Sequence, residues 1–130
     1  TQWANDPHGF LSPAVKAKAL DVGPKMLDMG RRARAAGIKV AFGTDASVSR
    51  HGQNAREFAL LVRAGLTPLE AVQAATVNAA DHLGIGTDVG RIADGRTADI
   101  IAVRGDPLAD VRVLESVSFV MHDGRVVRRD

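Results

Sequence analysis

The residue best placed to do chemistry is Asp45, which follows the apolar run 38–42 and the pair Gly43-Thr44. In parallel α/β folds, catalytic groups lie at the carboxyl ends of strands, where the strand fixes their position and loops form the pocket. A carboxylate there can bind a divalent cation, and it can act as a general base toward a metal-bound water. The alternative is that Asp45 only caps a turn or the next helix, because Gly-Thr-Asp alone is a weak motif.

The elements that would position Asp45 follow from helix and strand signals. Ser12-Pro13 is typical of a helix start, and helical character runs to Ala36, with Gly37 as a natural stop. Gly23-Pro24 is expected to kink this helix or split it in two. The apolar residues 38–42 then predict a buried strand, so that helix and strand together form half of an α/β unit.

Two more helices are predicted after the polar loop 46–53. The first is capped by Asn54 and ends at Gly65. The second begins at Thr67, where Thr-Pro-Leu-Glu combines an N-cap, a proline at the first helical position and a capping-box glutamate, and it runs to Leu83.

The last third of the sequence has the texture of a small β structure. Residues 99–103 predict a strand, and residues 117–121 and 125–127 predict a hairpin around the turn Asp123-Gly124. We therefore expect a boundary near residue 86, with an α/β part over 1–86 and a β part over 87–130.

Composition excludes several classes of protein. With no cysteine, the chain has neither disulfides nor thiolate metal sites, which fits a reducing, cytoplasmic location. A net charge of only +2 with four Phe and one Trp argues against a nucleic-acid partner. The sequence has no apolar run of the roughly 20 residues that a membrane span needs, so no membrane partner is expected.

The order of these features closely resembles the end of amidohydrolase-superfamily enzymes, especially the imidazolonepropionase-like and Xaa-Pro dipeptidase branch. The resemblance is carried by an ordered series over nearly the whole chain: helix, Gly37, strand, Gly43-Thr44-Asp45, His51-Gly52, Asn54, Thr67-Pro68-Leu69-Glu70-Ala71, Asn78-Ala79-Ala80, Gly90-Arg91-Ile92, Gly95, Ala98-Asp99-Ile100 and Asp123-Gly124. It implies an α/β fold, namely the C-terminal fragment of a (β/α)8 TIM-type barrel followed by part of a small β-sandwich.

The resemblance also implies roles for individual residues. Asp45 matches the aspartate that ends the eighth barrel strand, contacts the metal and shuttles a proton from the attacking water to the leaving nitrogen. His51 resembles the family's His-Gly element and could orient its loop or touch substrate, whereas the plainer reading is a structural loop histidine. Arg50 could receive a substrate carboxylate or be merely solvated. The other histidines, His8, His82 and His122, are expected to be solvated or structural.

The rest of such a site does not occur in this sequence. The family needs a His-x-His after the first strand, a Lys or Glu at the fourth, and histidines at the fifth and sixth. A catalytic zinc normally has three protein ligands, so one aspartate cannot hold it. We therefore predict that the chain alone is inactive. The complete enzyme is expected to bind one or two divalent metal ions, which we predict to be zinc. Binding would require the missing N-terminal barrel segment or a complementary chain.

Two functional hypotheses remain open. The first is the C-terminal part of a metal-dependent hydrolase acting on C–N bonds in small molecules or peptides. The second is a non-catalytic scaffold or interaction domain derived from an amidohydrolase C-terminus. Both predict association, because a strand over 38–42 would have open edges in this chain. An oligomer is therefore expected, formed by a truncated product or by a chain that pairs with a partner.

Overall fold

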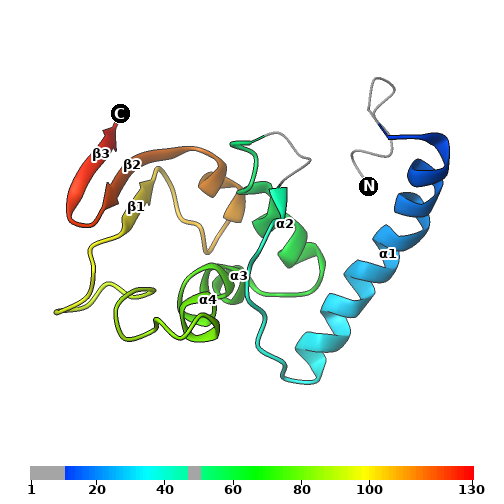
Figure 1. Cartoon of the computed structure of the whole chain (residues 1–130), viewed down its shortest axis with the longest axis horizontal. Helices are drawn as coiled ribbons and strands as arrows, with labels where there is room; N and C mark the ends of the chain where they lie inside the picture. The colour runs from blue at the N-terminus through cyan, green and yellow to red at the C-terminus, as the bar shows by residue number, and fades with distance from the viewer. Residues whose placement is uncertain (1–10, 47–50) are drawn as a thin grey trace.

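The computed structural model describes residues 11–46 and 51–130, which form a mixed helix and strand structure. Within these residues the elements follow one another as α1 (Pro13–Ala35), α2 (Arg56–Arg63), α3 (Pro68–Ala75), α4 (Val77–His82), β1 (Ile100–Val103), the 3-10 helix η3 (Val111–Glu115), β2 (Val117–His122) and β3 (Arg125–Arg129). Helix α1 lies at one end of the molecule and the sheet at the other, with α2, α3 and α4 between them (Figure 1). In the described ranges, no helix combines the length and apolar character that a membrane span needs.

Helix α1 begins where the sequence predicts, because Ser12 is its N-cap and Pro13 its first residue. It is one continuous helix through Pro24, so the predicted split is wrong. A proline removes one N–H and leaves the carbonyl four residues earlier without its helical partner. That carbonyl belongs to Leu20, and both Leu20 and Pro24 are exposed, so water can satisfy it without breaking the helix.

Close approach of backbones joins α1 to α2. A Cβ placed on Gly30 would lie 2.7 Å from the Cβ of Ala64, so only glycine fits at this crossing. Ala64 is buried, and Leu27 and Ala33 on α1 are half-buried. The helical spacing of Met26, Leu27, Gly30 and Ala33 predicts one buried face of α1, but the Met26 side chain is 55% exposed, so for Met26 the prediction is wrong.

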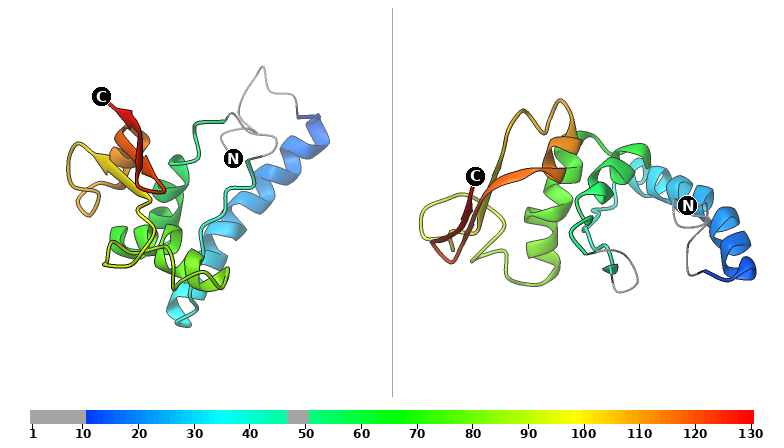
Figure 2. Two further views of the ribbon diagram at one scale, coloured as in Figure 1. Left: turned by 60° about the vertical axis from the view of Figure 1, so that its left-hand side comes forward. Right: turned by 90° about the horizontal axis from the view of Figure 1, so that it is seen from above.

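Residues 38–45, called the 38–45 segment below, form neither a helix nor a strand, which corrects the prediction of a strand over 38–42. The segment leaves the end of α1 and runs back beside α2 and α3 (Figures 1 and 2). A strand requires a second strand to accept and donate its backbone hydrogen bonds. In the described part of the chain all the strands belong to one sheet, and that sheet is at the far end of the molecule.

The helix predicted from Thr67 to Leu83 starts as expected but is interrupted. Thr67 and Glu70 form the predicted capping box at the start of α3. The interruption falls at Thr76, whose φ of −123° and ψ of −94° are not helical. Its hydroxyl donates to the carbonyl of Val72 at 2.8 Å, and such a bond from a threonine side chain competes with the helical backbone pattern.

The C-terminal sheet agrees with the sequence. Its strands are antiparallel in the order β1-β2-β3. The turn between β2 and β3 is the predicted Asp123-Gly124 pair, with φ of 49° and 72°. Two successive residues with positive φ are typical of the type I′ hairpin turn, whose twist matches the flanking strands. The division into a part before residue 86 and a part after it stays a prediction.

The buried core of the described residues is small and made largely of alanine. Its members are Ala64, Leu66, Ala71, Ala74, Ala80, Val111 and Leu114. Alanines let the helices approach closely, but each of them buries little apolar surface. Large apolar side chains instead remain exposed on α1, on the 38–45 segment and around the sheet.

Candidate active site around Asp45

Backbone and side-chain hydrogen bonds hold the 38–45 segment against α3 and α4. The Phe42 N–H donates to the carbonyl of Ala74 at 2.9 Å, near the end of α3. The carbonyl of Val40 accepts from the side-chain amide of Asn78 on α4 at 3.1 Å. These helix contacts satisfy backbone groups that would pair with another strand in a sheet. They fix the direction in which the segment approaches Asp45.

An aromatic contact attaches the same segment to α2. The rings of Phe42 and Phe58 are stacked, with centroids 4.9 Å apart and an interplanar angle of 26°. Offset stacked aromatic rings contribute about 0.5–1.5 kcal/mol beyond their buried area. The helical spacing of Phe58, Leu61 and Val62 predicts an apolar face on α2, and Phe58 on that face contacts the segment.

Asp45 lies at the end of the segment with an exposed side chain. Its φ of 44° is in the left-handed region, which is uncommon for a residue other than glycine. The residue before it, Thr44, accepts a hydrogen bond through Oγ1 from the side-chain amide of Asn54 at 3.0 Å. The residues that could orient Asp45 are therefore Phe42 and Thr44, each held by a different contact.

The residues described in 11–46 and 51–130 do not by themselves fit a metal ion, since they contain no group of three His, Asp or Glu side chains that could hold one. Zinc sites need about three protein ligands, and here Asp45 offers one. A second carboxylate, Glu57 on α2, has a raised pKa because it is half-buried, and it does not complete such a group. Metal binding at Asp45 stays a prediction that requires ligands from elsewhere.

The other predicted site residues receive little structural support. His51 is an exposed residue in a turn shortly before α2. Arg50 and His8 lie outside the described residues. His82 is in the last turn of α4, as predicted for a structural histidine. Among the described residues, no hydrogen bond or ion pair joins His51 to Asp45, and the substrate-binding roles of His51 and Arg50 stay predictions.

His122 is exposed, as predicted, but it is also part of a polar contact that the sequence did not reveal. Its Nδ1 is 2.8 Å from Oδ1 of Asp99, which also accepts the backbone N–H of Asp123 at 2.8 Å. Both bonds lower the pKa of the Asp99 carboxyl, and the bond from the Asp123 backbone N–H has the larger effect. The carboxylate joins the start of β1 to the β2–β3 turn, which is a structural role.

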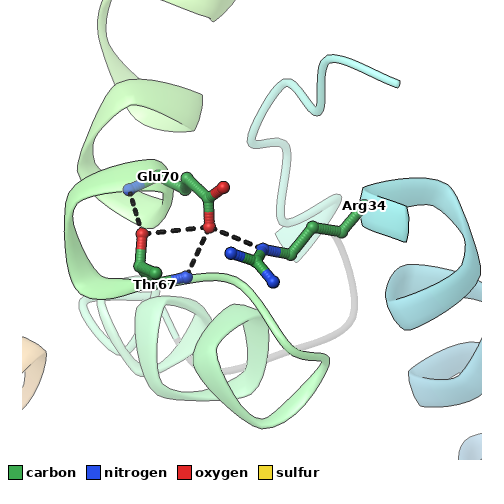
Figure 3. A network of polar contacts seen from close by, with 3 residues as sticks. All are labelled: Arg34, Thr67 and Glu70. Carbon is green, nitrogen blue, oxygen red and sulfur yellow. Dashed lines mark hydrogen bonds and ion pairs between the residues drawn. The ribbon is translucent and has the colours of Figure 1, made fainter. Parts of the chain in front are cut away.

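A second polar network joins α1 to α3 (Figure 3). The Oε2 atom of Glu70 accepts three bonds: from Arg34 Nε at 2.8 Å, from the Thr67 backbone N–H at 2.6 Å and from Thr67 Oγ1 at 2.9 Å. The Arg34 bond, followed by the two from Thr67, lowers the pKa of the Glu70 carboxyl to about 2. Sequence reasoning found the Thr67–Glu70 box but not Arg34, because the arginine is 36 positions away from the glutamate.

This network predicts a pH dependence of stability. The ordinary pKa of a glutamate carboxyl is 4.5, and in the fold the pKa of Glu70 is lowered to about 2. The charged carboxylate therefore stabilises the fold fully above about pH 4.5, and this stabilisation is lost as the pH falls toward about 2. We expect the free energy of unfolding, measured with urea at several pH values in that window, to fall less steeply for Glu70→Gln than for the unmodified chain.

Arg34→Met should reduce the same slope partially, because it removes the largest cause of the lowered pKa and leaves the two Thr67 bonds. Arg32→Met, on the same turn of α1, controls for the loss of one positive charge. Equal slopes for the unmodified chain and Glu70→Gln would show that the network contributes no stability.

A hollow of about 260 Å³ lies next to this network, at the start of the 38–45 segment. Its lining includes Arg34, Lys39, Glu70 and Asn78. Asp45 is at the opposite end of the segment and does not line the hollow. The hollow is therefore separate from the candidate active site.

Comparison with known proteins agrees with the resemblance seen in the sequence. A sequence profile of the amidohydrolase family matches residues 16–127. Ochratoxinase from Aspergillus niger is 39% identical over 89 residues, which cover 67% of this chain and 18% of that protein. Imidazolonepropionase from Deinococcus deserti is 42% identical over 85 residues, which cover 63% of this chain and 21% of that protein.

A solved structure shows the same fold over nearly the full chain. A Xaa-Pro dipeptidase with bound methionine in the active site superposes with a TM-score of 0.87 and 41% sequence identity, covering 98% of this chain and 31% of the other. The chain thus spans about a third or less of the length of these relatives. The match of the family profile to most of the chain shows that this protein belongs to the amidohydrolase family.

Proposed function

We propose that this chain is the C-terminal part of a metal-dependent amidohydrolase that hydrolyses C–N bonds in amides, cyclic amides or peptides. Similarity to ochratoxinase, imidazolonepropionase and a Xaa-Pro dipeptidase supports this class of reaction. The observation that carries the proposal is the position of Asp45 at the end of the 38–45 segment, which α2, α3 and α4 hold in place. In this proposal the segment is the last strand of a barrel, and residues 87–130 are strands of a small β-sandwich.

The proposed role of Asp45 is that of metal ligand and proton shuttle. A divalent metal, zinc in our proposal, would polarise the substrate carbonyl and lower the pKa of the attacking water. The Asp45 carboxylate would take the proton of that water and pass it to the departing nitrogen. A carboxylate suits both steps, because it can hold the proton between attack and departure. The Asp45 side chain is exposed, so its carboxylate is free to move. Contacts at Phe42 and Thr44 hold the backbone that carries it, and both properties suit these steps.

The remaining ligands would come from another part of the enzyme, either an N-terminal barrel segment of the same polypeptide or a complementary chain. Two surfaces of this chain could receive it. The 38–45 segment has no strand beside it in the described residues. Helix α1 exposes an apolar face that includes Val15, Met26 and Met29, which are 48%, 55% and 57% exposed. Exposed apolar faces of this kind are typical of surfaces that another segment covers.

A complementation assay tests this proposal. The chain would be coexpressed with the N-terminal barrel segment of a related amidohydrolase, and hydrolysis of amide and Xaa-Pro peptide substrates would be followed with added zinc. We expect no turnover from either part alone and metal-dependent turnover from the complex. A folded complex without turnover would instead support the scaffold hypothesis, in which the chain kept the family's C-terminal fold and lost its chemistry.

A further inference from the structure

The side chain of Asn54 makes a contact that its position in the sequence does not predict. The sequence predicts that Asn54 caps α2, but the N-cap is Ala55, which provides no side-chain bond. The Asn54 amide instead donates to Thr44 Oγ1 at 3.0 Å, ten residues earlier in the chain. Because Asn is a favoured capping residue, a side chain directed elsewhere at a helix start indicates a different use.

The residue that follows Thr44 has an unusual backbone. Asp45 has φ of 44°, and among the described residues only Asp45 and Asp123 adopt positive φ without being glycine. Asp123 is in a two-residue hairpin turn and its backbone N–H is bonded to Asp99. Left-handed backbone in a residue other than glycine costs free energy and persists only where its surroundings hold it.

The contacts around Asp45 supply such support from one side. Thr44 is half-buried and is fixed to Asn54, and Phe42 is fixed to Phe58 and to the carbonyl of Ala74. Phe58 is in the first turn of α2. Asn54 lies just before the helix, and its carbonyl accepts the backbone N–H of Glu57 at 3.0 Å. The start of α2 therefore contacts the end of the 38–45 segment at Phe42 and Thr44.

We propose that Asn54 is a positioning residue for Asp45: its bond to Thr44 sets the direction of the Asp45 carboxylate. This inference rests on the proposed function of Asp45 and deepens it. A carboxylate that must reach a water and then a leaving nitrogen needs a fixed base, because a displacement of about 1 Å at a catalytic group can lower the rate by about 100-fold. The Thr44–Asn54 bond provides that base without touching the reacting atoms.

The test uses the complemented enzyme and three single variants. Asn54→Leu and Thr44→Val each remove one partner with little change in volume, and we expect kcat to fall by about 10- to 100-fold with KM nearly unchanged. Asn54→Asp should restore most of kcat, because the Thr44 hydroxyl can donate to a carboxylate in place of accepting from an amide. The double variant Thr44→Val/Asn54→Leu should be no slower than the slower single variant, as expected for two residues that act through one bond.

A second measurement covers the isolated chain, where no turnover is expected. Asn54→Leu should shift the backbone NMR signals of Asp45 and leave those of Asp123, the other aspartate with positive φ, unchanged. Unchanged Asp45 signals, or additive effects of Thr44→Val and Asn54→Leu on kcat, would overturn the inference. Failure of the proposed function looks different: in that case Asp45→Asn itself would leave turnover unaffected.

Discussion

Asp45→Asn should lower kcat of the complemented enzyme by about 100- to 10,000-fold, the range that general acid–base catalysis contributes. An amide of the same size keeps the shape of the side chain but cannot hold a proton or carry a negative charge toward a metal. The unmodified Asp45 side chain is exposed, so the substitution should leave the stability of the isolated chain nearly unchanged. The measurement is steady-state kinetics at saturating metal, with bound metal determined on the same samples.

Asp94→Asn is a matched control for this substitution. Asp94 is also an exposed aspartate, but it lies in the loop between α4 and β1 and not in the 38–45 segment. We expect it to retain full turnover. Full turnover with Asp45→Asn as well would remove Asp45 from the chemistry and leave the scaffold hypothesis as the better account of this chain.

Charged residues on the exposed face of α1 should prevent complementation. The Met26 and Met29 side chains are 55% and 57% exposed in this chain, and in the complete enzyme we expect them to be covered. Burying one such side chain contributes about 1.5–3 kcal/mol. Met26→Lys/Met29→Lys should therefore weaken binding of the N-terminal segment by about 100-fold or more, as measured by titration calorimetry.

The same double substitution should leave the isolated chain folded, because both side chains are already in contact with solvent. Asp28→Lys, at an exposed position on another side of α1, changes the charge of this helix by the same amount and sign and serves as the control. Unchanged binding by the methionine variant would mean that α1 is not part of the interface, and the segment proposed to complete the barrel would then have to dock elsewhere.

Local signals in the sequence predicted the parts of the fold that local interactions determine. The capping box of Thr67 and Glu70 and the turn at Asp123-Gly124 involve residues no more than three positions apart, and both are present. The start of α1 at Ser12-Pro13 is local in the same way. At the two helix starts the capping side chain accepts a backbone N–H three residues away. The turn depends on positive φ at Asp123 and Gly124, which these residue types tolerate.

The predictions that were wrong concern segments whose structure depends on interactions between residues distant in the sequence. Residues 38–42 have the composition of a strand, but a strand exists only with a paired neighbour, and this segment is bonded to helices instead. The sequence predicts that Asn54 caps a helix, whereas its side chain is hydrogen-bonded to Thr44.

The candidate site shows the same division. Asp45 was found from its place after an apolar run, which is a local signal, and the structure puts it at the end of a held segment. The residues that hold that segment, Phe58, Ala74 and Asn78, come from three helices that are distant in sequence. The only sequence signal for a contact between Phe42 and Phe58 is that the chain has few aromatic residues.

We propose that this chain is one part of an amidohydrolase whose other metal ligands lie outside it. The most direct test is to sequence the coding DNA upstream of Thr1 in the source genome. We expect an open reading frame with a His-x-His motif after a first strand, a strand-end Lys or Glu, and two further strand-end histidines. A start codon directly before Thr1, in a genome with no separate chain that carries those ligands, would contradict it.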